Sequence, residues 1–406
     1  MNGLVNENLH IQLMPGFEID YSNDNDKTIV DLITVMGAIY CADVSITARK
    51  TKLAIEIPVF QVEVWQGLTE KIKHLLKWVS SEDYQISFRL FNKELIEKKE
   101  AQMKLSLDSP SQRIVSLFSG GLDSLTGAYY NFKNEIASDY IGFLNKHEEA
   151  TKQRLLADFY KKMLNPTPDI ILIEKPVDKK KWHIQATRSL LYFSLAVAKA
   201  YYNQSKQINL YENGILTLNP NLYGRFTTKT THPKTLFEFN NLLAELKIDV
   251  KVEHRFLYKT KGESINEMDI DFKNVIKYSF TCGAGRSHNL KSHEGQCGVC
   301  IPCLLRKISM AAYNNEEYDC LYHFDYEEMI IEPDVYYYEY ISNIEYFKQY
   351  VELIKNNSIL AQLKIKQRYY DDVDYLVKTN EMLNKFVNEF ERYMEKYDLH
   401  RYARAY

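Results

Sequence analysis

The sequence predicts an α/β fold, a doubly wound parallel sheet, from three features of its central region. Short apolar runs alternate there with helical stretches, a pattern typical of parallel strands covered by helices on both faces. The first strand runs into a Ser-Gly-Gly turn that opens a helix, and four clustered cysteines follow later in the chain. At 406 residues the chain has room for two or three domains.

The composition is that of a globular protein. Hydrophobic residues make up 45% and charged residues 26% of the chain, which argues against disorder. The 51 Lys and Arg against 54 Asp and Glu give a net charge of −3, which argues against a general binder of nucleic acid or of membrane surfaces. No apolar run approaches the roughly 18 residues that span a bilayer, and the N-terminus has no signal-peptide pattern. We therefore expect a cytoplasmic protein.

Residues 1–105 predict a separate N-terminal α+β domain. Apolar residues at helical spacing are interspersed there with strand-like alternation. A charged stretch followed by turn formers then places a boundary near residue 105. The expected helices are residues 29–44 and 68–79, and the expected strands are residues 53–57, 62–64 and 86–90.

The pattern of residues 106–260 predicts the core of the sheet domain. Residues 261–320 are expected to form the end of this core and to include the cysteine segment. Parallel sheets of this kind bind ligands at the carboxyl ends of their strands. The expected strands are residues 114–118, 140–144, 170–173 and 208–211, and the expected helices are residues 152–163 and 186–200.

Residues 321–406 predict a helical C-terminal region rich in tyrosine. This region holds 15 of the 31 tyrosines of the chain. Tyrosine supplies large amphipathic contact area, which suits either an interface with a partner protein or packing of the tail onto the core. The expected apolar face of its last helix consists of Met382, Leu383, Phe386, Val387, Phe390 and Met394.

Four cysteines predict a structural zinc site. Cys282, Cys297, Cys300 and Cys303 have the spacing C-x14-C-x2-C-x2-C, and a two-residue gap lets two thiolates turn onto one cation. Four thiolates suit tetrahedral Zn²⁺ and leave no open position for catalysis. An iron–sulfur cluster and a coincidental grouping are the alternatives. His288 and His293, inside the long gap, are candidates to replace one thiolate, with solvated loop histidines as the favoured alternative.

The segment after the first core strand predicts a phosphate-binding loop. Paired glycines let the backbone approach a phosphate, and the following helix directs unpaired N–H groups at it. Neither the Walker A pattern nor G-x-G-x-x-G is present. Asp123 places a carboxylate beside the expected anion, and this is typical of a Mg²⁺ ligand or of a residue that caps a turn. The loop consists of Ser119, Gly120, Gly121, Leu122, Asp123 and Ser124.

This loop resembles the signature of the N-type ATP pyrophosphatases (PP-loop enzymes), which cleave ATP between the α- and β-phosphates. Within that superfamily, the segment T-C…Q-C-G-x-C-x-x-C-L-L-R-K resembles the 7-cyano-7-deazaguanine synthase (QueC) family. Arg188, opening a helix, is similar to the arginine of the family's G-R-N segment, and Lys261-Gly262-Glu263 is similar to its K-A-E. The resemblance covers roughly residues 110–315.

Two further segments resemble the QueC-like proteins of bacterial anti-phage operons (the Qat and type IV CBASS systems). They are the E-N-G…L-N-P run that starts at Glu212 and the T-T-H-P run that ends at Pro233. Those relatives also carry extra terminal regions. The resemblance implies an enzyme of anti-phage defence that adenylates 7-carboxy-7-deazaguanine with ATP and Mg²⁺ and releases pyrophosphate. It then transfers the activated deazaguanine to an amine of a partner protein from the same operon.

The resemblance also implies roles for single residues. The loop would cradle pyrophosphate, with Asp123 organising the loop or Mg²⁺, Lys261 facing a second phosphate, and Arg188 meeting a phosphate or the substrate carboxylate. For Lys261 and Arg188, a solvated or structurally paired side chain is the alternative. His232 is a candidate general base for the attacking amine, with a structural histidine as the alternative. The expected substrate pocket comprises Glu212, Asn213, Asn219, Thr228 and Thr230, with helix or turn capping as the alternative for Glu212.

Other functions fit parts of the sequence. The same chemistry with ammonia would yield the nitrile product of QueC. A non-catalytic zinc-containing scaffold, or a module that binds nucleic acid through its zinc knuckle, would need the cysteines but not the loop. The intact loop argues against the scaffold, and the net charge of −3 argues against nucleic acid.

Overall fold

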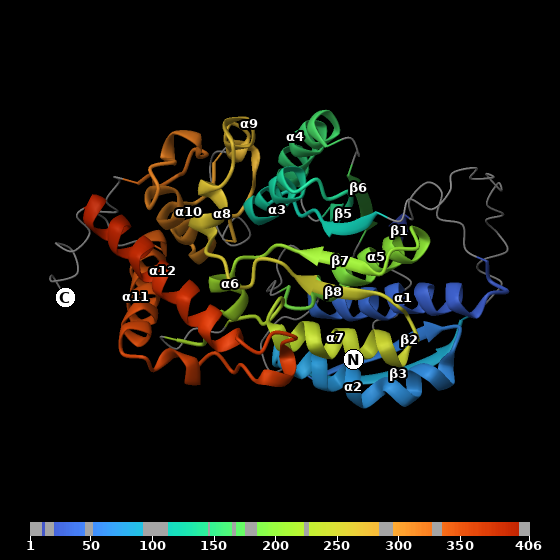
Figure 1. Ribbon diagram of the computed structural model, residues 1–406. Coiled ribbons are helices and arrows are strands. Elements are labelled where there is room, and N and C mark those ends of the chain that lie inside the picture. The colour runs from blue at the N-terminus through green and yellow to red at the C-terminus, as the bar shows by residue number, and fades with distance from the viewer. Residues whose placement is uncertain are drawn as a thin grey trace.

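A six-stranded sheet forms the centre of the molecule in the computed structural model (Figure 1). The structure describes residues 10–12, 20–44, 52–91, 113–144, 147–164, 168–174, 185–222, 227–283, 295–326 and 335–397. The strand order is β1-β6-β5-β4-β7-β8, and only β1 runs antiparallel to its neighbour. The strands are β1 (His10–Gln12), β4 (Ile114–Leu117), β5 (Ser138–Leu144), β6 (Asp169–Glu174), β7 (Gln207–Leu210) and β8 (Lys251–His254).

The four strands predicted for this sheet are therefore confirmed, and it is parallel over five strands. β8 was not predicted, because a four-residue strand with one buried apolar residue, Val252, carries almost no alternating pattern.

Helices cover both faces of this sheet (Figure 1). Helices α3 (Leu122–Lys133) and α4 (His147–Met163) lie on one face, and α5 (Arg188–Tyr202) and α7 (Pro233–Glu245) on the other. Strand β5 shows why: Tyr140 packs into the core under α3 and α4, whereas Ile141 and Phe143 point into the opposite core. The structure is thus a mixed α/β protein with a parallel sheet.

The N-terminal segment shares the core of the α5 face. It contains α1 (Asp24–Val44), α2 (Val62–Ser80) and a parallel pair of strands, β2 (Lys52–Val59) and β3 (Asp83–Leu90). Helix α1 packs against α5, and α2 packs against α7. The boundary predicted near residue 105 lies outside the described residues.

The strand predicted at residues 62–64 is wrong, because α2 begins at Val62. Asp31 of α1 accepts the backbone N–H groups of Phe60 and Gln61 and so ends β2 there. The buried residues that follow, from Trp65 to Val79, keep helical spacing, which outweighs the short V-E-V alternation.

The C-terminal region, residues 321–406, is helical, as predicted, in its described part. Long helices α11 (Val335–Lys355) and α12 (Tyr375–Lys396) pack together and against α10 (Ile301–Ala311). The predicted apolar face of α12 is fully buried, and Tyr346, Tyr350 and Tyr393 are buried with it. These three tyrosines therefore pack onto the core, the second of the two roles predicted for the tyrosine-rich region. The shorter helices are α6 (Gly214–Leu218), α8 (Lys261–Asn266), α9 (Ile270–Lys273), η3 (Ile276–Tyr278), η4 (Glu316–Tyr318), η5 (Ile359–Ala361) and η6 (Gln367–Tyr369).

No helix in the described ranges is both long and apolar enough to cross a membrane.

The packing of α12 predicts a large difference between two truncations. Phe386 is buried and lies 5.8 Å, ring to ring, from Phe347. We expect Phe386→Ala to lower the free energy of unfolding by about 3–5 kcal/mol. Val377→Ala, on the exposed side of the same helix, should change it by less than about 0.5 kcal/mol. Urea unfolding followed by circular dichroism measures both. Equal effects would contradict this packing.

Candidate functional site

The carboxyl ends of β4 and β7 form the point where the chain changes direction across the sheet. From β4 the chain builds β5 and β6 on one side, then returns to build β7 and β8 on the other. Connections that leave two neighbouring strands in opposite directions open a crevice at the carboxyl ends of those strands. The predicted phosphate loop follows β4, and residues 211–213 follow β7, so both meet at this edge.

The phosphate loop has the backbone geometry of an anion-binding turn. Gly120 has φ +73°, a left-handed conformation that favours glycine, and Gly121 is the N-cap of α3. Having no side chain, Gly121 leaves the first-turn N–H groups of α3 without a side-chain cap. Ser119 Oγ accepts the Gly121 N–H at 3.2 Å, and Ser124 Oγ donates to the Gly121 carbonyl at 2.8 Å. Hydrogen bonds within the loop therefore define the turn, and they leave the N-terminus of α3 without a side-chain cap, as an anion site requires.

Asp123 and Lys261 form an ion pair beside this turn, although 138 residues separate them. Lys261 is the first residue of α8, and its side chain is completely buried, while that of Asp123 is 20% exposed. Asn213, in the segment between β7 and α6, donates from Nδ2 to Asp123 Oδ1 and to Glu212 Oε1, both at 3.1 Å. The structure thus brings together four predicted site residues, which we call the Asp123 cluster: Asp123, Glu212, Asn213 and Lys261.

Glu212 is a carboxyl group whose ionisation is suppressed. Burial, and next the nearby Asp123 carboxylate, raise the pKa of Glu212 well above its usual range, and Lys261 acts in the opposite direction. Asn213 contributes in a second way, since its Oδ1 accepts the Leu216 N–H and caps α6. The capping alternative that the sequence left open thus applies to Asn213 rather than to Glu212.

His254, at the carboxyl end of β8, is a site residue that the sequence did not reveal. Its Nε2 lies 2.7 Å from Thr217 Oγ1, and its Nδ1 has no hydrogen-bond partner within the described part of the chain. Burial lowers the pKa of His254 to about 3, although the neighbouring Asp123 carboxylate acts to raise it. The ring is therefore a neutral imidazole beside the Asp123 cluster. The sequence would have indicated His254 only if β8 had been predicted as a core strand, because His254 is its last residue.

Arg188 lies at the same edge of the sheet but outside the Asp123 cluster. It is the first residue of α5, which runs from the carboxyl edge back toward the start of β7. Thr187, just before it, donates its N–H and its hydroxyl to Asp43 of α1, each at 2.8 Å. The N-terminal segment therefore holds the start of the helix that carries Arg188.

The predicted pocket residues after α6 form a second group. Asn219 ends α6 with φ +32° and donates from Nδ2 to the Thr228 carbonyl at 3.2 Å. Thr230 lies in the half-buried turn that follows. Thr217 connects this second group to His254. Its Oγ1 lies 3.4 Å from Thr231 Oγ1 and also contacts His254 Nε2. Asn219, Thr228 and Thr230 therefore border the Asp123 cluster only through other residues.

His232 is held in a structural role, so this geometry favours the structural alternative over a general base. Its Nδ1 accepts the Lys234 N–H at 3.1 Å as the N-cap of α7, and its Nε2 lies 2.8 Å from the Leu363 carbonyl. Both ring nitrogens are thus occupied. Burial lowers the pKa of His232 to about 3, and the ring packs edge-on against Trp78.

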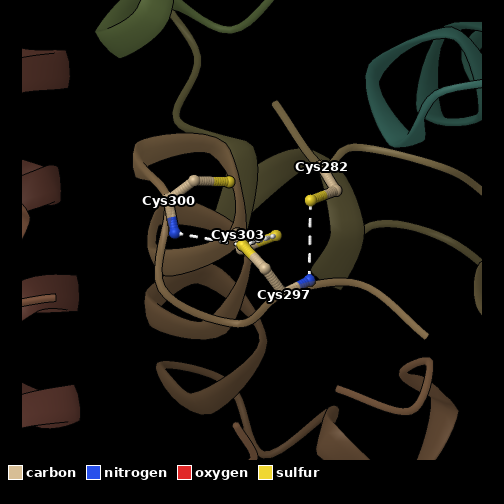
Figure 2. Close-up of side chains that lie close together, drawn as sticks. All are labelled: Cys282, Cys297, Cys300 and Cys303. Atoms are coloured by element: carbon tan, nitrogen blue, oxygen red, sulfur yellow. Dashed lines mark hydrogen bonds between the residues drawn. The ribbon is translucent and has the colours of Figure 1, made fainter. Parts of the chain in front are cut away.

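The four cysteines form a cluster that fits a metal ion. Their sulfur atoms all lie within 4.8 Å of one another, and all four residues are buried (Figure 2). Gly298 has φ +82°, and a Cβ there would come within 2.1 Å of the Phe324 carbonyl, so the knuckle requires glycine. Cys297 Sγ accepts the N–H groups of Val299 and Cys300, the usual environment of a ligating thiolate. The donor set suits zinc. His288 and His293 lie outside the described residues.

One segment joins the cysteine cluster to the phosphate loop. Phe280 donates its N–H to the Gly120 carbonyl at 3.0 Å, two residues before the ligand Cys282. Arg306, fully buried in α10, donates to the Ser279 carbonyl at 3.1 Å and to Thr281 Oγ1 at 3.2 Å. Cys300 and Cys303 belong to the start of the same helix. Hydrogen bonds thus connect the cysteine cluster to Gly120 through residues 279–282.

Loss of one thiolate should release the metal. We expect the purified protein to contain about one zinc per chain, and Cys300→Ser to abolish most of this content and to lower the melting temperature. Cys41→Ser, a change at a buried cysteine of α1, should leave the zinc content unchanged. Plasma mass spectrometry measures the metal, and visible absorbance would reveal an iron–sulfur cluster instead. Equal metal content in both variants would contradict the site.

Two buried neutral histidines predict a loss of stability in acid. In the folded protein, with pKa values of about 3, His232 and His254 stay neutral at pH 5. In the unfolded chain, with a pKa of about 6.5, they bind protons, so the free energy of unfolding falls as pH drops below about 6.5. The loss is about 2 kcal/mol per histidine at pH 5.

Denaturant unfolding at pH 7 and pH 5 measures this loss. His232→Gln should show a smaller decrease than the wild type, by about 2 kcal/mol. The same decrease in both proteins would contradict a neutral buried His232.

Comparison with known proteins found no matching family model, no matching curated protein and no matching solved structure.

Proposed function

We propose that this protein is a QueC-like PP-loop enzyme that activates a carboxylate with ATP and joins it to an amine. The observation that carries the proposal is the glycine turn at the N-terminus of α3, with the Asp123–Lys261 pair directly beside it. An anion-binding helix N-terminus, a carboxylate for Mg²⁺ and a buried lysine for phosphate are the groups that adenylation needs. The strand order, which changes direction between β4 and β7, supports a nucleotide site at this edge.

The reaction follows from the chemistry of carboxylates. A carboxylate does not react with amines because its leaving group would be oxide. Its oxygen therefore first attacks the α-phosphorus of ATP, the bond to the β-phosphate breaks, and pyrophosphate leaves with the electron pair. The amine then attacks the acyl carbon and loses a proton, and AMP leaves with the electrons of the acyl–oxygen bond. The protein contributes mainly positioning and charge stabilisation.

The residues of the site divide this work. The open first turn of α3, with Ser119 and Ser124, would hold the departing pyrophosphate. Asp123 would exchange Lys261 for Mg²⁺ when nucleotide binds, which frees the buried ammonium for a phosphate oxygen. Mg²⁺ would neutralise the charge that develops on the phosphates.

Glu212 and His254 would serve the carboxylate substrate and the amine. A protonated Glu212 can donate to a guanine-like ring. Unlike the ring of His232, the neutral ring of His254 has an Nδ1 without a partner within the described residues, so it can hydrogen-bond to a substrate group.

The proposed substrate is 7-carboxy-7-deazaguanine, and the proposed acceptor is an amine of a partner protein from the same anti-phage operon. The E-N-G…L-N-P segment supports this choice, because Glu212 and Asn213 from it belong to the Asp123 cluster. A second candidate is nitrile formation with ammonia, as in QueC. It uses the same cluster and differs only in the amine.

One incubation tests this function. Protein, ATP, Mg²⁺ and 7-carboxy-7-deazaguanine are mixed with ammonia or with proteins of the same operon, and AMP, pyrophosphate and intact protein masses are recorded. We expect stoichiometric AMP and pyrophosphate and a partner protein that gains the acyl mass. A free nitrile with ammonia alone would favour the QueC reaction, and absence of AMP in every mixture would contradict both.

Variants of the loop test the assignment of residues. Ser119→Ala should lower the rate of pyrophosphate release by about 10²-fold, because it removes a donor to the departing charge. Asp123→Ala should abolish release. Ser358→Ala, at an exposed position after α11, is the matched control and should keep full activity. Full activity of Ser119→Ala would contradict the loop assignment.

A further inference from the structure

Helix α8, which carries Lys261, is too short to fix its own position. It spans six residues, Lys261–Asn266, and its start depends on a capping box. Thr260 Oγ1 accepts the Glu263 N–H at 3.0 Å, and Glu263 Oε2 accepts the Thr260 N–H at 2.9 Å. Since a helix this short is marginal alone, contacts from outside it must determine where Lys261 lies.

Glu389 of α12 supplies such a contact from the C-terminal region. Its side chain is buried, with the residue 2% exposed, and its Oε1 accepts a hydrogen bond from Thr260 Oγ1. The Thr260 hydroxyl therefore caps α8 and binds α12 with the same oxygen. A second link joins the two helices at the surface, where Lys385 pairs with Glu263.

Gly262 shows how closely the carboxyl group approaches α8. A Cβ at Gly262 would lie 2.5 Å from Glu389 Oε1 and 2.7 Å from its carboxyl carbon. Glycine, rather than the alanine of the K-A-E pattern, therefore stands next to Lys261 because the Glu389 carboxyl group occupies the space of a side chain.

The contact acts as a hydrogen bond of a neutral acid. Burial raises the pKa of Glu389 to about 8, so the group is largely protonated at neutral pH. An amide at this position would keep the accepting oxygen, whereas alanine would leave the Thr260 hydroxyl without its partner.

We propose that Glu389 is a positioning residue which, through Thr260, holds the start of α8 so that the Lys261 ammonium meets Asp123. The C-terminal region then completes the site instead of only covering it. The inference rests on the proposed function only in that Lys261 serves the reaction; the position of Lys261 is testable without turnover.

Amine acylation measures that position directly. The full-length wild type, Glu389→Ala and Glu389→Gln are treated briefly with an acetylating ester, and the modified lysines are quantified by peptide mass spectrometry. Lys307, a buried lysine of α10 that donates to the Phe324 carbonyl, is the internal reference for general loosening of the fold. Pyrophosphate release is measured on the same samples.

We expect Glu389→Ala to raise the acylation rate of Lys261 about tenfold relative to Lys307, because one buried hydrogen bond no longer opposes local opening. Glu389→Gln should stay within about twofold of the wild type. Unchanged Lys261 labelling in Glu389→Ala, or a parallel rise at Lys307, would overturn the proposal. If the wild type releases no pyrophosphate, the proposed function fails, while the labelling ratio still decides the role of Glu389.

Gly262→Ala provides a second, independent arm. It should displace the carboxyl group and raise Lys261 labelling as Glu389→Ala does. The double variant should exceed neither single variant, because both act on the same contact. Additive effects would show that Gly262 and Glu389 act separately and would also overturn the proposal.

Discussion

The buried ammonium of Lys261 is the constraint around which the site is organised. An unpaired buried charge costs several kcal/mol, so the lysine must meet a carboxylate, and Asp123 is that partner. This requirement brings α8 against the phosphate loop from 138 residues away. Asn213 then links the segment between β7 and α6 to the same carboxylate. Under the proposed function, a nucleotide with Mg²⁺ would replace this ion pair with two new ones.

The two regions outside the sheet contribute to the site in the same way. On the N-terminal side, Asp43 of α1 accepts two hydrogen bonds from Thr187, the residue before Arg188. On the C-terminal side, Glu389 of α12 accepts one from Thr260, the residue before Lys261. In both cases a buried carboxyl group holds the start of a helix whose first residue is a cation. The terminal regions are therefore part of the site's architecture, and their buried tyrosines serve this packing.

The cysteine cluster supports the site from a third direction. Its ligands lie at both ends of a unit in which Arg306 fixes residues 276–281 and Phe280 holds Gly120. A structural metal supplies stability that a loop of this length lacks by itself. We therefore regard the cysteine cluster as a determinant of loop geometry.

The sequence by itself determined the features whose chemistry is local. The glycine turn with its serines and the C-x2-C-x2-C knuckle need only neighbouring residues, so their spacing predicted them, as apolar periodicity predicted most strands and helices. Tertiary structure alone decided the rest. Only the fold shows that His232 Nε2 forms a hydrogen bond with the Leu363 carbonyl, 131 residues away. The fold also shows that His254 is the last residue of a core strand. The physical reason is that burial and hydrogen-bond partners set what a titratable side chain can do, and both arise between segments that are distant in the chain.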